Sequence, residues 1–524
     1  MNSAQNANRS GKPRRWLVTA GVYILVLAAI GVAEGLADSS QDQSAKSSGP
    51  AGDSLASVVT DLRKEKKLVG LAAMVMIDGH VEGVAAVGER KKGSGVRLEL
   101  DDRWHLGSIT KSVTATMIAR LIESGQMQWS DTVGECLPDA MMHEEWKRVT
   151  LRQLLTHTAG APPNFPLWVA LKTPALGPEC TRARREAVLN VVAEKPLGPP
   201  GERFAYSNVG YTIAGAMAER ATGATWEELV KRDVFEPLKL AGVGFGPPKS
   251  PSCEQPRGHK VVLGWKVSVD DDADNTPIMG PAGTVHMTLR DLCNYAMEHL
   301  RGELGTGKLL TAETYKQLHA PELSNYACGW VKKRPSYAIP HTLYWHNGSN
   351  TMWYALVVFI PGKNMAVAVA SNDGDIDQAQ SAAWKVVETS ANRFNVEGDA
   401  ARRQSLPSDA FPKKSPFAAV RWRDSEPEVR VGEEWFQLVS LDGITAGDIV
   451  KFSQSSYDDK WRKRFEEDLV EVLFRMGHEP KDAVPLVLQS LTSTERVTLE
   501  GVPITQANHR AIRDAAQVRE HDEK

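Results

Sequence analysis

Residues 344–372 read YWHNGSNTMWYALVVFIPGKNMAVAVASN and carry the clearest strand pattern in the chain. This stretch contains two apolar runs separated by Pro361-Gly362, and adjacent Pro and Gly residues mark a turn. The pattern therefore predicts two strands joined by a short connection. A helix from about Gln378 to Arg393 is expected to follow them.

The beginning of the folded region shows a related pattern. A helix is expected from about Leu55, and LAAMVMIDGHVEGVAAVGE follows at 71–89. Asp78-Gly79 divides that stretch into two β-rich runs, which is a strong hairpin signal. The chain then becomes rich in predicted helix up to about residue 300. Helix plus strands at the start, helices in the middle and strands plus helix at the end predict one sheet assembled from both ends of the region.

Beyond a joint at 404–416 that contains Pro, Ser and Lys, the character of the chain changes. EEWFQLVSLDGITAGDIV predicts a strand and a turn, and VPLVLQSLTSTERVTLEGV predicts a hairpin. Between them, one helical face ending at the C-cap glycine Gly477 is expected to carry Trp461, Phe465, Leu469 and Leu473. We expect a small separate α+β domain without a chemical motif, serving for packing or recognition.

The composition is that of a globular protein. The chain has 524 residues, of which 42% are hydrophobic and 24% charged. A net charge of -3 does not favour nucleic acid or an anionic membrane as the main partner. The five cysteines are scattered without a C-x-x-C pair, so they indicate neither a zinc site nor a disulfide framework, and their odd number leaves at least one free thiol.

The N-terminus predicts export. GKPRR precedes an uncharged apolar run from Trp16 to Ala33, and basic residues before such a run stay on the cytoplasmic side. The run is long for a signal-peptide core and just long enough to span a bilayer. Small residues also allow cleavage after Ala37, so a removed signal and a retained membrane anchor both remain open. Either places the rest of the chain outside the cytoplasm, in the periplasm or facing it from the membrane.

The first candidate for chemistry is WHLGSITKSV at 104–113, where Ser108 and Lys111 lie three positions apart at a predicted helix start. The lysine amine is one helical turn away and can reach the serine hydroxyl. Lysine, with an ordinary pKa of about 10.4, becomes a usable base when burial and a neighbouring cation disfavour its charged form. Taken alone, S-x-x-K also fits an ordinary N-cap followed by a surface lysine.

Two further stretches carry polar groups that could join this pair. Tyr206 and Asn208 lie ahead of a helix rich in small residues, and in an extended segment their side chains would face one cleft. His346 and Gly348 lie in the strand-rich region, where a glycine lets a substrate or another backbone approach closely. Each fragment alone also fits a packing role.

In this order, the S-x-x-K, Y-x-N and H-x-G elements resemble the serine β-lactamase and penicillin-binding-protein superfamily, and the Y-x-N element resembles its class C β-lactamase branch. VTLRQLLTHTAGAP and GPAGTVHMTLRDLCNYA also resemble recurring segments of the family, over residues 55–395. The resemblance implies an α+β, β-lactamase/transpeptidase-like fold, with an antiparallel sheet built from both chain ends, flanking helices and a helical subdomain. The expected division is a signal or anchor segment at 1–37, a linker at 38–53, the hydrolase domain at 54–395, a linker at 396–416 and the small domain at 417–524.

The resemblance also implies roles for the motif residues. Ser108 is the nucleophile that forms an acyl-enzyme, and Lys111 accepts its proton or lowers the pKa of Tyr206, which shuttles a proton to the leaving group. Asn208 positions the substrate carbonyl. The substrate strand and oxyanion hole are assigned to His346, to Gly348 and to the backbone N–H groups of Ser108 and Ser349. No metal and no cofactor are expected.

One departure bears on the substrate. Class C β-lactamases carry K-T-G as the third element, and here it is His346-Asn347-Gly348, as in related D-aminopeptidases, DD-peptidases and esterases. A histidine gives a hydrogen-bonding group whose charge depends on pH near 6.5. Efficient hydrolysis of anionic β-lactams is therefore in doubt.

Three rival sites have simpler interpretations. GDSL at 52–55 copies a hydrolase motif but follows a polar linker, so Asp53 or Ser54 is expected to cap a helix that opens at Leu55. VDDDADN at 269–275 lacks the later Gly and Glu of a calcium loop and is expected to be a solvated surface loop. His157 follows an apolar helix and is expected to cap or pack.

We therefore expect an exported serine hydrolase acting on small esters, amides or D-amino-acid peptides. The alternative is a non-catalytic protein on the same fold, either binding penicillin or cell-wall peptides or serving as a membrane-tethered interaction protein. The partner expected is a small-molecule or peptide substrate and not nucleic acid. The sequence leaves the partner of the C-terminal domain open.

Overall fold

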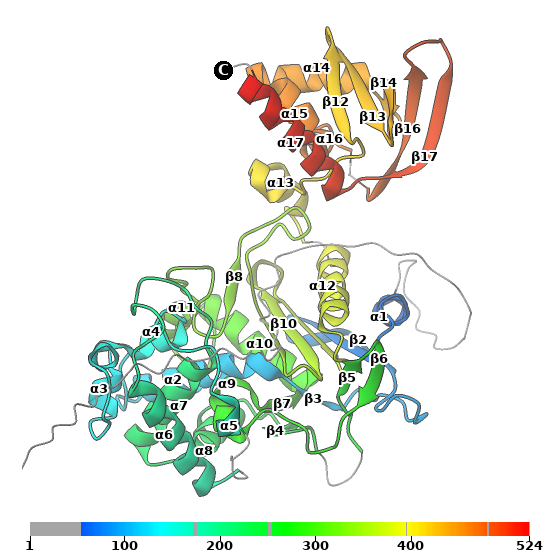
Figure 1. The fold of residues 1–524 in the computed structure, drawn as a ribbon. Helices are drawn as coiled ribbons and strands as arrows, with labels where there is room; N and C mark the ends of the chain where they lie inside the picture. The colour runs from blue at the N-terminus through cyan, green and yellow to red at the C-terminus, as the bar shows by residue number, and fades with distance from the viewer. Residues whose placement is uncertain (1–53, 171–175, 250–253, 395, 479–480, 523–524) are drawn as a thin grey trace, which may run out of the picture. The chain divides into compact units, whose positions relative to one another are not determined.

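The computed structural model describes residues 54–170, 176–249, 254–394, 396–478 and 481–522 (Figure 1). The expected signal or anchor segment 1–37, the linker 38–53 and Cys253 lie outside the described residues. Within the described ranges, no helix is both long enough and apolar enough to cross a membrane.

The main sheet has six strands in the order β2-β1-β11-β10-β9-β8, and every neighbouring pair is antiparallel. The strands are β1 (Gly70–Ile77), β2 (His80–Gly88), β8 (Val331–Lys333), β9 (Leu343–Ser349), β10 (Tyr354–Ile360) and β11 (Met365–Ser371). The first strand pairs with the last one, with Ala72 opposite Ala370. The prediction of one sheet built from both ends of the region is confirmed.

Two short connections set the register of this sheet. The β1–β2 hairpin turns at Asp78 and Gly79, whose φ angles of 53° and 84° fit a two-residue hairpin loop. Between β10 and β11, Pro361–Lys363 form one 3₁₀ turn that ends at Asn364 in the left-handed conformation. Both turns lie where the sequence predicts them.

Helices cover both faces of the main sheet (Figure 1). On one face, α1 (Leu55–Glu65) and α12 (Ile376–Arg393) pack Val59 and Val386 against strand residues such as Val75. On the other face, α10 (Leu289–Glu303) packs Leu292 against neighbours that include Met74. Alternate strand residues therefore enter two different apolar cores, as the two-residue period of a strand requires.

The middle of the chain forms the helical part and two small sheets. Its longer helices are α2 (Thr110–Glu123), α6 (Pro178–Val192), α7 (Asn208–Thr222) and α11 (Ala312–Leu318). Its shorter helices are α3 (Val133–Cys136), α4 (Leu151–Leu155), α5 (Leu167–Ala170), α8 (Trp226–Val230) and α9 (Gly280–Gly283). One small sheet has the order β3-β7-β4, with β3 (Arg103–His105), β4 (Val243–Phe245) and β7 (Val285–Thr288). The other is a hairpin of β5 (His259–Val262) and β6 (Trp265–Ser268).

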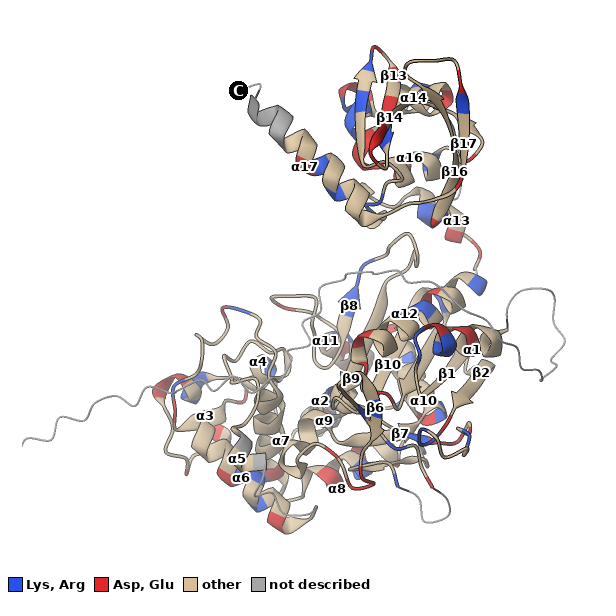
Figure 2. Ribbon diagram, turned by 45° about the vertical axis from the view of Figure 1, so that its right-hand side comes forward, with Lys and Arg blue, Asp and Glu red and all other residues tan. Residues whose placement is uncertain are grey.

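The C-terminal region has its own sheet and its own apolar core. Its strands are β12 (Ala419–Arg423), β13 (Glu426–Val431), β14 (Glu434–Leu441), β15 (Ile444–Thr445), β16 (Ala483–Ser490) and β17 (Arg496–Pro503). Its helices are α14 (Ala446–Tyr457), α15 (Trp461–Glu467), α16 (Leu469–Arg475) and α17 (Gln506–Asp522), and α13 (Asp399–Gln404) lies in the preceding linker. Acidic and basic residues are interspersed over the helices and strands (Figure 2).

The predicted hairpin near the C-terminus is confirmed, and Gly477 adopts the positive φ of a helix C-cap, at 89°. The single helix expected to carry Trp461 and Leu473 is wrong. Asp468 leaves the helical conformation, with φ -121° and ψ 29°, and divides the segment into α15 and α16. Both halves still bury their apolar residues in the same core, so the apolar face survives the break.

Candidate active site

Ser108 lies in a single 3₁₀ turn, Gly107–Ile109, that leads directly into α2. His105 holds the beginning of this turn, because its Nδ1 accepts the backbone N–H of Gly107 at 3.1 Å. The other ring nitrogen lies 2.6 Å from a carboxylate oxygen of Asp274. Asp270 to Asp272 are exposed, as expected of the acidic loop, but Asp274 points inward, and the expectation of an entirely solvated loop is wrong at that residue.

Lys111 is completely buried, one turn after Ser108. Its Nζ lies 3.0 Å from Oγ of Ser108, 2.7 Å from Oδ1 of Asn208 and 2.8 Å from the carbonyl oxygen of Ala282. All three partners are uncharged groups. Burial lowers the pKa of Lys111 well below its ordinary value of 10.5. Desolvation causes this shift, so the neighbouring cation expected from the sequence is not needed to lower the pKa of Lys111.

Tyr206 and Asn208 both reach this amine, although they lie on different elements. Tyr206 precedes the cap of α7, and Asn208 is the first residue of that helix. The phenol ring centre lies 4.8 Å from Nζ of Lys111, and the phenol forms a hydrogen bond with Ser108. Burial raises the pKa of Tyr206, and this hydrogen bond opposes the shift only in part. The raised pKa of Tyr206 favours the protonated phenol in the protein without a bound substrate.

The third motif lies on β9, beside the turn that carries Ser108. A methyl group on Gly348 would overlap the carbonyl oxygen of Leu106 and the backbone nitrogen of Ser108. A methyl group on Gly107 would likewise overlap the backbone nitrogen of Ser349. Only glycine fits at 348, because the backbone of residues 106–108 lies directly against it. This close approach brings the N–H groups of Ser108 and Ser349 near each other.

His346 is buried, and its pKa is lowered to about 3, first by burial and then by the nearby Lys111. Its Nδ1 lies 2.5 Å from the carbonyl oxygen of Asn347 and must donate there, so Nε2 accepts the hydroxyl of Tyr326 at 3.0 Å. The expectation that His346 changes its charge near pH 6.5 is wrong, because the ring has no access to the water that would solvate an imidazolium.

Several groups at the site have no signature in the sequence. The carbonyl of Ala282 and the side chain of Asn164, which accepts the Asn208 amide at 2.7 Å, complete the surroundings of Lys111. Tyr326 is identified by its hydrogen bond to His346 and by its ring contact with Tyr206. His157 packs as expected: its ring lies 4.3 Å from the Tyr206 ring, and its Nδ1 accepts the backbone N–H of Ser207 at 3.1 Å.

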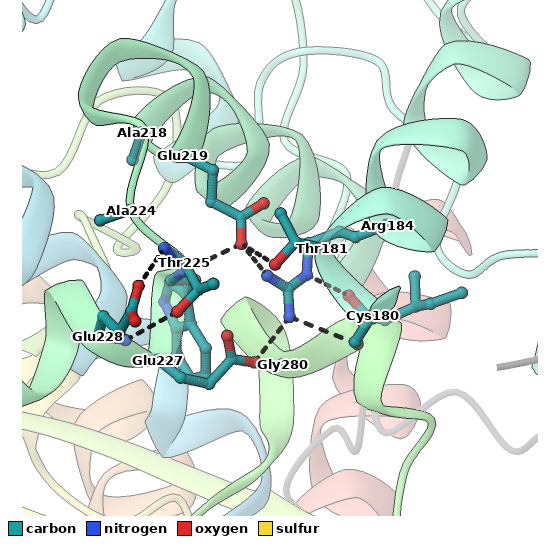
Figure 3. Close-up of polar contacts among 12 residues, drawn as sticks. Cys180, Thr181, Arg184, Ala218, Glu219, Ala224, Thr225, Glu227, Glu228 and Gly280 are labelled. Atoms are coloured by element: carbon teal, nitrogen blue, oxygen red, sulfur yellow. Dashed lines mark hydrogen bonds and ion pairs between the residues drawn. The ribbon is translucent and has the colours of Figure 1, made fainter. Parts of the chain in front are cut away.

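A buried arginine, Arg184, holds the segment that carries Ala282, and Figure 3 shows its guanidinium together with Glu219 and Glu227. Arg184 of α6 donates to the carbonyl oxygens of Ile278 at 3.0 Å and of Pro277 at 3.2 Å, just before α9. Its guanidinium also pairs with Glu219 of α7 and, at 2.8 Å, with Glu227 of α8. Side chains from three helices thus hold the backbone segment that contains Ala282, whose carbonyl oxygen accepts a hydrogen bond from Lys111.

The rival nucleophile at residues 52–55 has a structural role. Ser54 caps α1, with its Oγ accepting the backbone N–H of Ser57 at 3.2 Å, and Leu55 opens the helix as predicted. Four of the cysteines, Cys136, Cys180, Cys293 and Cys328, are free thiols in the described part of the chain.

Comparison with known proteins agrees with this geometry. The family model described as Beta-lactamase matches residues 55–391. Penicillin-binding protein 4 of Amycolatopsis lactamdurans is 28% identical over 333 residues, which cover 60% of this chain and 83% of that protein. The D-alanyl-D-alanine-carboxypeptidase/endopeptidase AmpH of Escherichia coli (strain K12) is 25% identical over 233 residues, which cover 44% of this chain and 57% of AmpH. The match thus spans little more than half of AmpH.

Solved structures share the fold. The octameric penicillin-binding protein homologue from Pyrococcus abyssi superposes with a TM-score of 0.53 and 18% identity, covering 85% of this chain and 95% of that one. The D-stereospecific amidohydrolase from Streptomyces sp. gives 0.50 and 23%, covering 63% of this chain and 98% of that one.

Fold and motif geometry define a member of the serine β-lactamase and penicillin-binding-protein superfamily, and the class C features of the Y-x-N element are consistent with this. The chain belongs to the β-lactamase family, whose model matches more than half of it.

Proposed function

We propose that the chain is a serine hydrolase that works through an acyl-enzyme on Ser108. The observation that carries this proposal is the environment of Lys111, a fully buried amine 3.0 Å from the Ser108 hydroxyl. A neutral amine has two N–H groups and one lone pair. The carbonyls of Asn208 and Ala282 accept the two N–H groups, which leaves the lone pair for the Ser108 O–H.

The proton transfers follow from this arrangement. As Oγ of Ser108 attacks a substrate carbonyl carbon, its proton passes to Nζ of Lys111 and the carbonyl oxygen becomes an oxyanion. The backbone N–H groups of Ser108 and Ser349 would stabilise that charge. When the bond to the leaving group breaks, Tyr206 donates its phenol proton to that group and regains one from Lys111. Water then attacks the acyl-enzyme by the same route in reverse, giving its proton to the site and releasing the acid.

The substrate class we propose is small esters, amides and D-amino-acid peptides. The uncharged His346 provides no permanent positive charge at the third motif, which is less suited to the carboxylate of a β-lactam than a lysine is. Relatives named as a D-alanyl-D-alanine-carboxypeptidase/endopeptidase and as a D-stereospecific amidohydrolase support D-configured amides as the natural substrates.

We also propose that the hydrolase domain works outside the cytoplasm, in the periplasm or tethered to the membrane. The support is the sequence of residues 11–33, in which a basic cluster precedes an uncharged apolar run. On this proposal the substrates are exported or cell-wall molecules rather than cytoplasmic metabolites.

The test is active-site labelling of the full chain. A fluorescent phosphonate should label wild type stoichiometrically, and Ser108→Ala should lose both the label and the turnover of a p-nitrophenyl ester while its thermal midpoint stays within about 2 °C. Ser54→Ala is the matched control and should keep both activities. Labelling without turnover would favour the non-catalytic binding protein, and loss of labelling in Ser54→Ala alone would move the nucleophile to the rival motif.

A further inference from the structure

The β5–β6 hairpin exposes an apolar end. Its tip residue Leu263 is 95% exposed and Trp265 is 72% exposed, and Val262 and Val267 are half exposed. Val262 pairs with Trp265 across the hairpin, and Lys260 pairs with Val267 two positions away on the same face. This face therefore presents Val262, Trp265 and Val267 together, with Leu263 beyond them. Contiguous exposed apolar side chains of this kind mark a contact with another molecule or a membrane.

The turn itself shows that Leu263 is not there for local stability. Leu263 and Gly264 have φ angles of 51° and 82°, nearly the same as Asp78-Gly79 and Asp442-Gly443 in two other hairpins of the chain. Two-residue turns with positive φ favour Asn, Asp or Gly at the first position. Among described non-glycine residues with positive φ, Leu263 is the only one with an aliphatic side chain. A conformationally costly residue at the most exposed point of the hairpin indicates a function.

Residues on the other face of the hairpin attach it to the rest of the chain. Lys266 donates to the carbonyl oxygen of Lys67 at 2.6 Å and pairs with the buried Asp373 at 2.7 Å. The hairpin is thereby bound to the chain immediately after α1. At its base, the ring of His259 accepts the backbone N–H of Lys92 and lies 2.7 Å from the carbonyl oxygen of Asn372.

We propose that the tip of this hairpin, Val262 to Trp265, inserts into the surface of a lipid bilayer. A protruding Leu and Trp pair suits the interface between headgroups and acyl chains, where an apolar body is buried and the indole N–H stays hydrated. The chain outside the described residues supports a membrane as the partner. Residues 34–54, which separate the apolar run 16–33 from α1, span at most about 75 Å when fully extended, so a bilayer holding that run would keep this part of the chain nearby.

Because the apolar run would already hold the protein at the membrane, the hairpin tip needs only a weak affinity for the bilayer. A contact too weak to bring a free protein to a membrane becomes populated when a second attachment holds the protein nearby. Asp270 to Asp272 follow β6 in the sequence, so the region of the hairpin carries acidic residues as well as Lys260. Insertion should therefore depend on the apolar tip and not on anionic lipid.

The experiment uses the full chain reconstituted into phosphatidylcholine vesicles, with and without brominated phosphatidylcholine as a tryptophan quencher. The difference between wild type and Trp265→Phe isolates the emission of Trp265, and Trp168→Phe isolates that of Trp168, a half-exposed tryptophan on α5. We expect brominated lipid to quench at least half of the Trp265 emission and less than a tenth of the Trp168 emission. Trp16 of the apolar run is present in wild type and in both variants, so its emission cancels in each difference.

Leu263→Asp converts the tip into the Asp-Gly turn used elsewhere in the chain, so the hairpin should stay folded. It should reduce the quenching of Trp265 at least fivefold, whereas Leu323→Asp, at a half-exposed leucine outside the hairpin, should not. Equal quenching of Trp265 and Trp168 would overturn the proposal. It would also be overturned if Leu263→Asp left the quenching unchanged, or if Trp265 were not quenched and Leu263→Asp dissociated an oligomer in detergent, since the tip would then be a contact between copies of the chain.

Discussion

Replacing Lys111 by methionine should change how the stability of the protein depends on pH. Because burial lowers the pKa of Lys111, the folded chain holds a neutral amine where the unfolded chain holds an ammonium ion. Between the folded-state pKa and the ordinary value of 10.5, the unfolded state binds one more proton. The free energy of unfolding of wild type therefore contains a contribution that increases with pH through this window and is largest at its upper end.

The expected size of this pH dependence follows from a difference of one bound proton between the folded and unfolded states. The slope within this window is about 1.4 kcal/mol per pH unit. Methionine has a similar length and no charge, so the variant lacks this slope. It also leaves the acceptors of Asn208 and Ala282 without a donor, at about 1–3 kcal/mol each, and that cost does not depend on pH. The variant should thus be less stable than wild type at pH 10, and the deficit should shrink by about 1.4 kcal/mol for each pH unit below 10 that lies within the window.

The assay is urea unfolding of the full chain at pH 7, 8, 9 and 10. Lys64→Met, at an exposed lysine of α1, is the control and should follow the wild-type slope. Parallel stability curves for wild type and Lys111→Met would show that Lys111 is protonated in the folded protein. The general-base role proposed for it would then fail.

Four further outcomes are expected. Tyr206→Phe and Lys111→Ala should each reduce ester turnover at least 100-fold, and the double variant should be little worse than either, because the two groups handle one proton; multiplicative losses in steady-state rates would contradict this. Gly348→Ala should reduce turnover more than tenfold and stability by about 1–3 kcal/mol, measured on the same preparation, because the methyl group overlaps the Ser108 backbone. The pH profile of kcat/KM for a neutral ester should have the same shape near pH 6.5 in wild type and in His346→Gln, since the pKa of His346 is about 3 and the ring is neutral above it. Arg184→Leu should destabilise the fold by about 3–5 kcal/mol in urea titrations, because Glu219 and Glu227 lose their buried partner, whereas Arg185→Leu at a neighbouring surface position should have little effect.

Much of the architecture could be predicted because it depends on local patterns. The alternation in residues 71–89 and 344–372, and turn residues such as Asp78-Gly79, are enough to place the central strands. The break at Asp468 could not be predicted, since the apolar spacing continues through it. The sequence does not predict the helix α14 either, because no apolar run separates its beginning from the preceding strand and turn.

The site was predictable where side-chain chemistry carries the signal. The serine and lysine spacing led to a hydrogen-bonded pair, and the Y-x-N element led to two further contacts of that pair. The carbonyl of Ala282 has no sequence signature, because every residue has one and only its placement matters. The neutrality of His346 likewise depends on burial and on Tyr326, which is 20 positions away in the sequence.

The pairing of β1 with β11 also constrains how the protein is made. Residues 78–364 separate the two strands, so during synthesis β1 must wait for its partner for roughly 15–60 s at ordinary translation rates. Throughout that interval β1 can pair only with β2, and its other edge stays open to unrelated nascent chains. We therefore expect ribosome-bound chains truncated before Met365 to require a holding chaperone, and protease resistance of the hydrolase domain to appear only after Ser371 has left the exit tunnel.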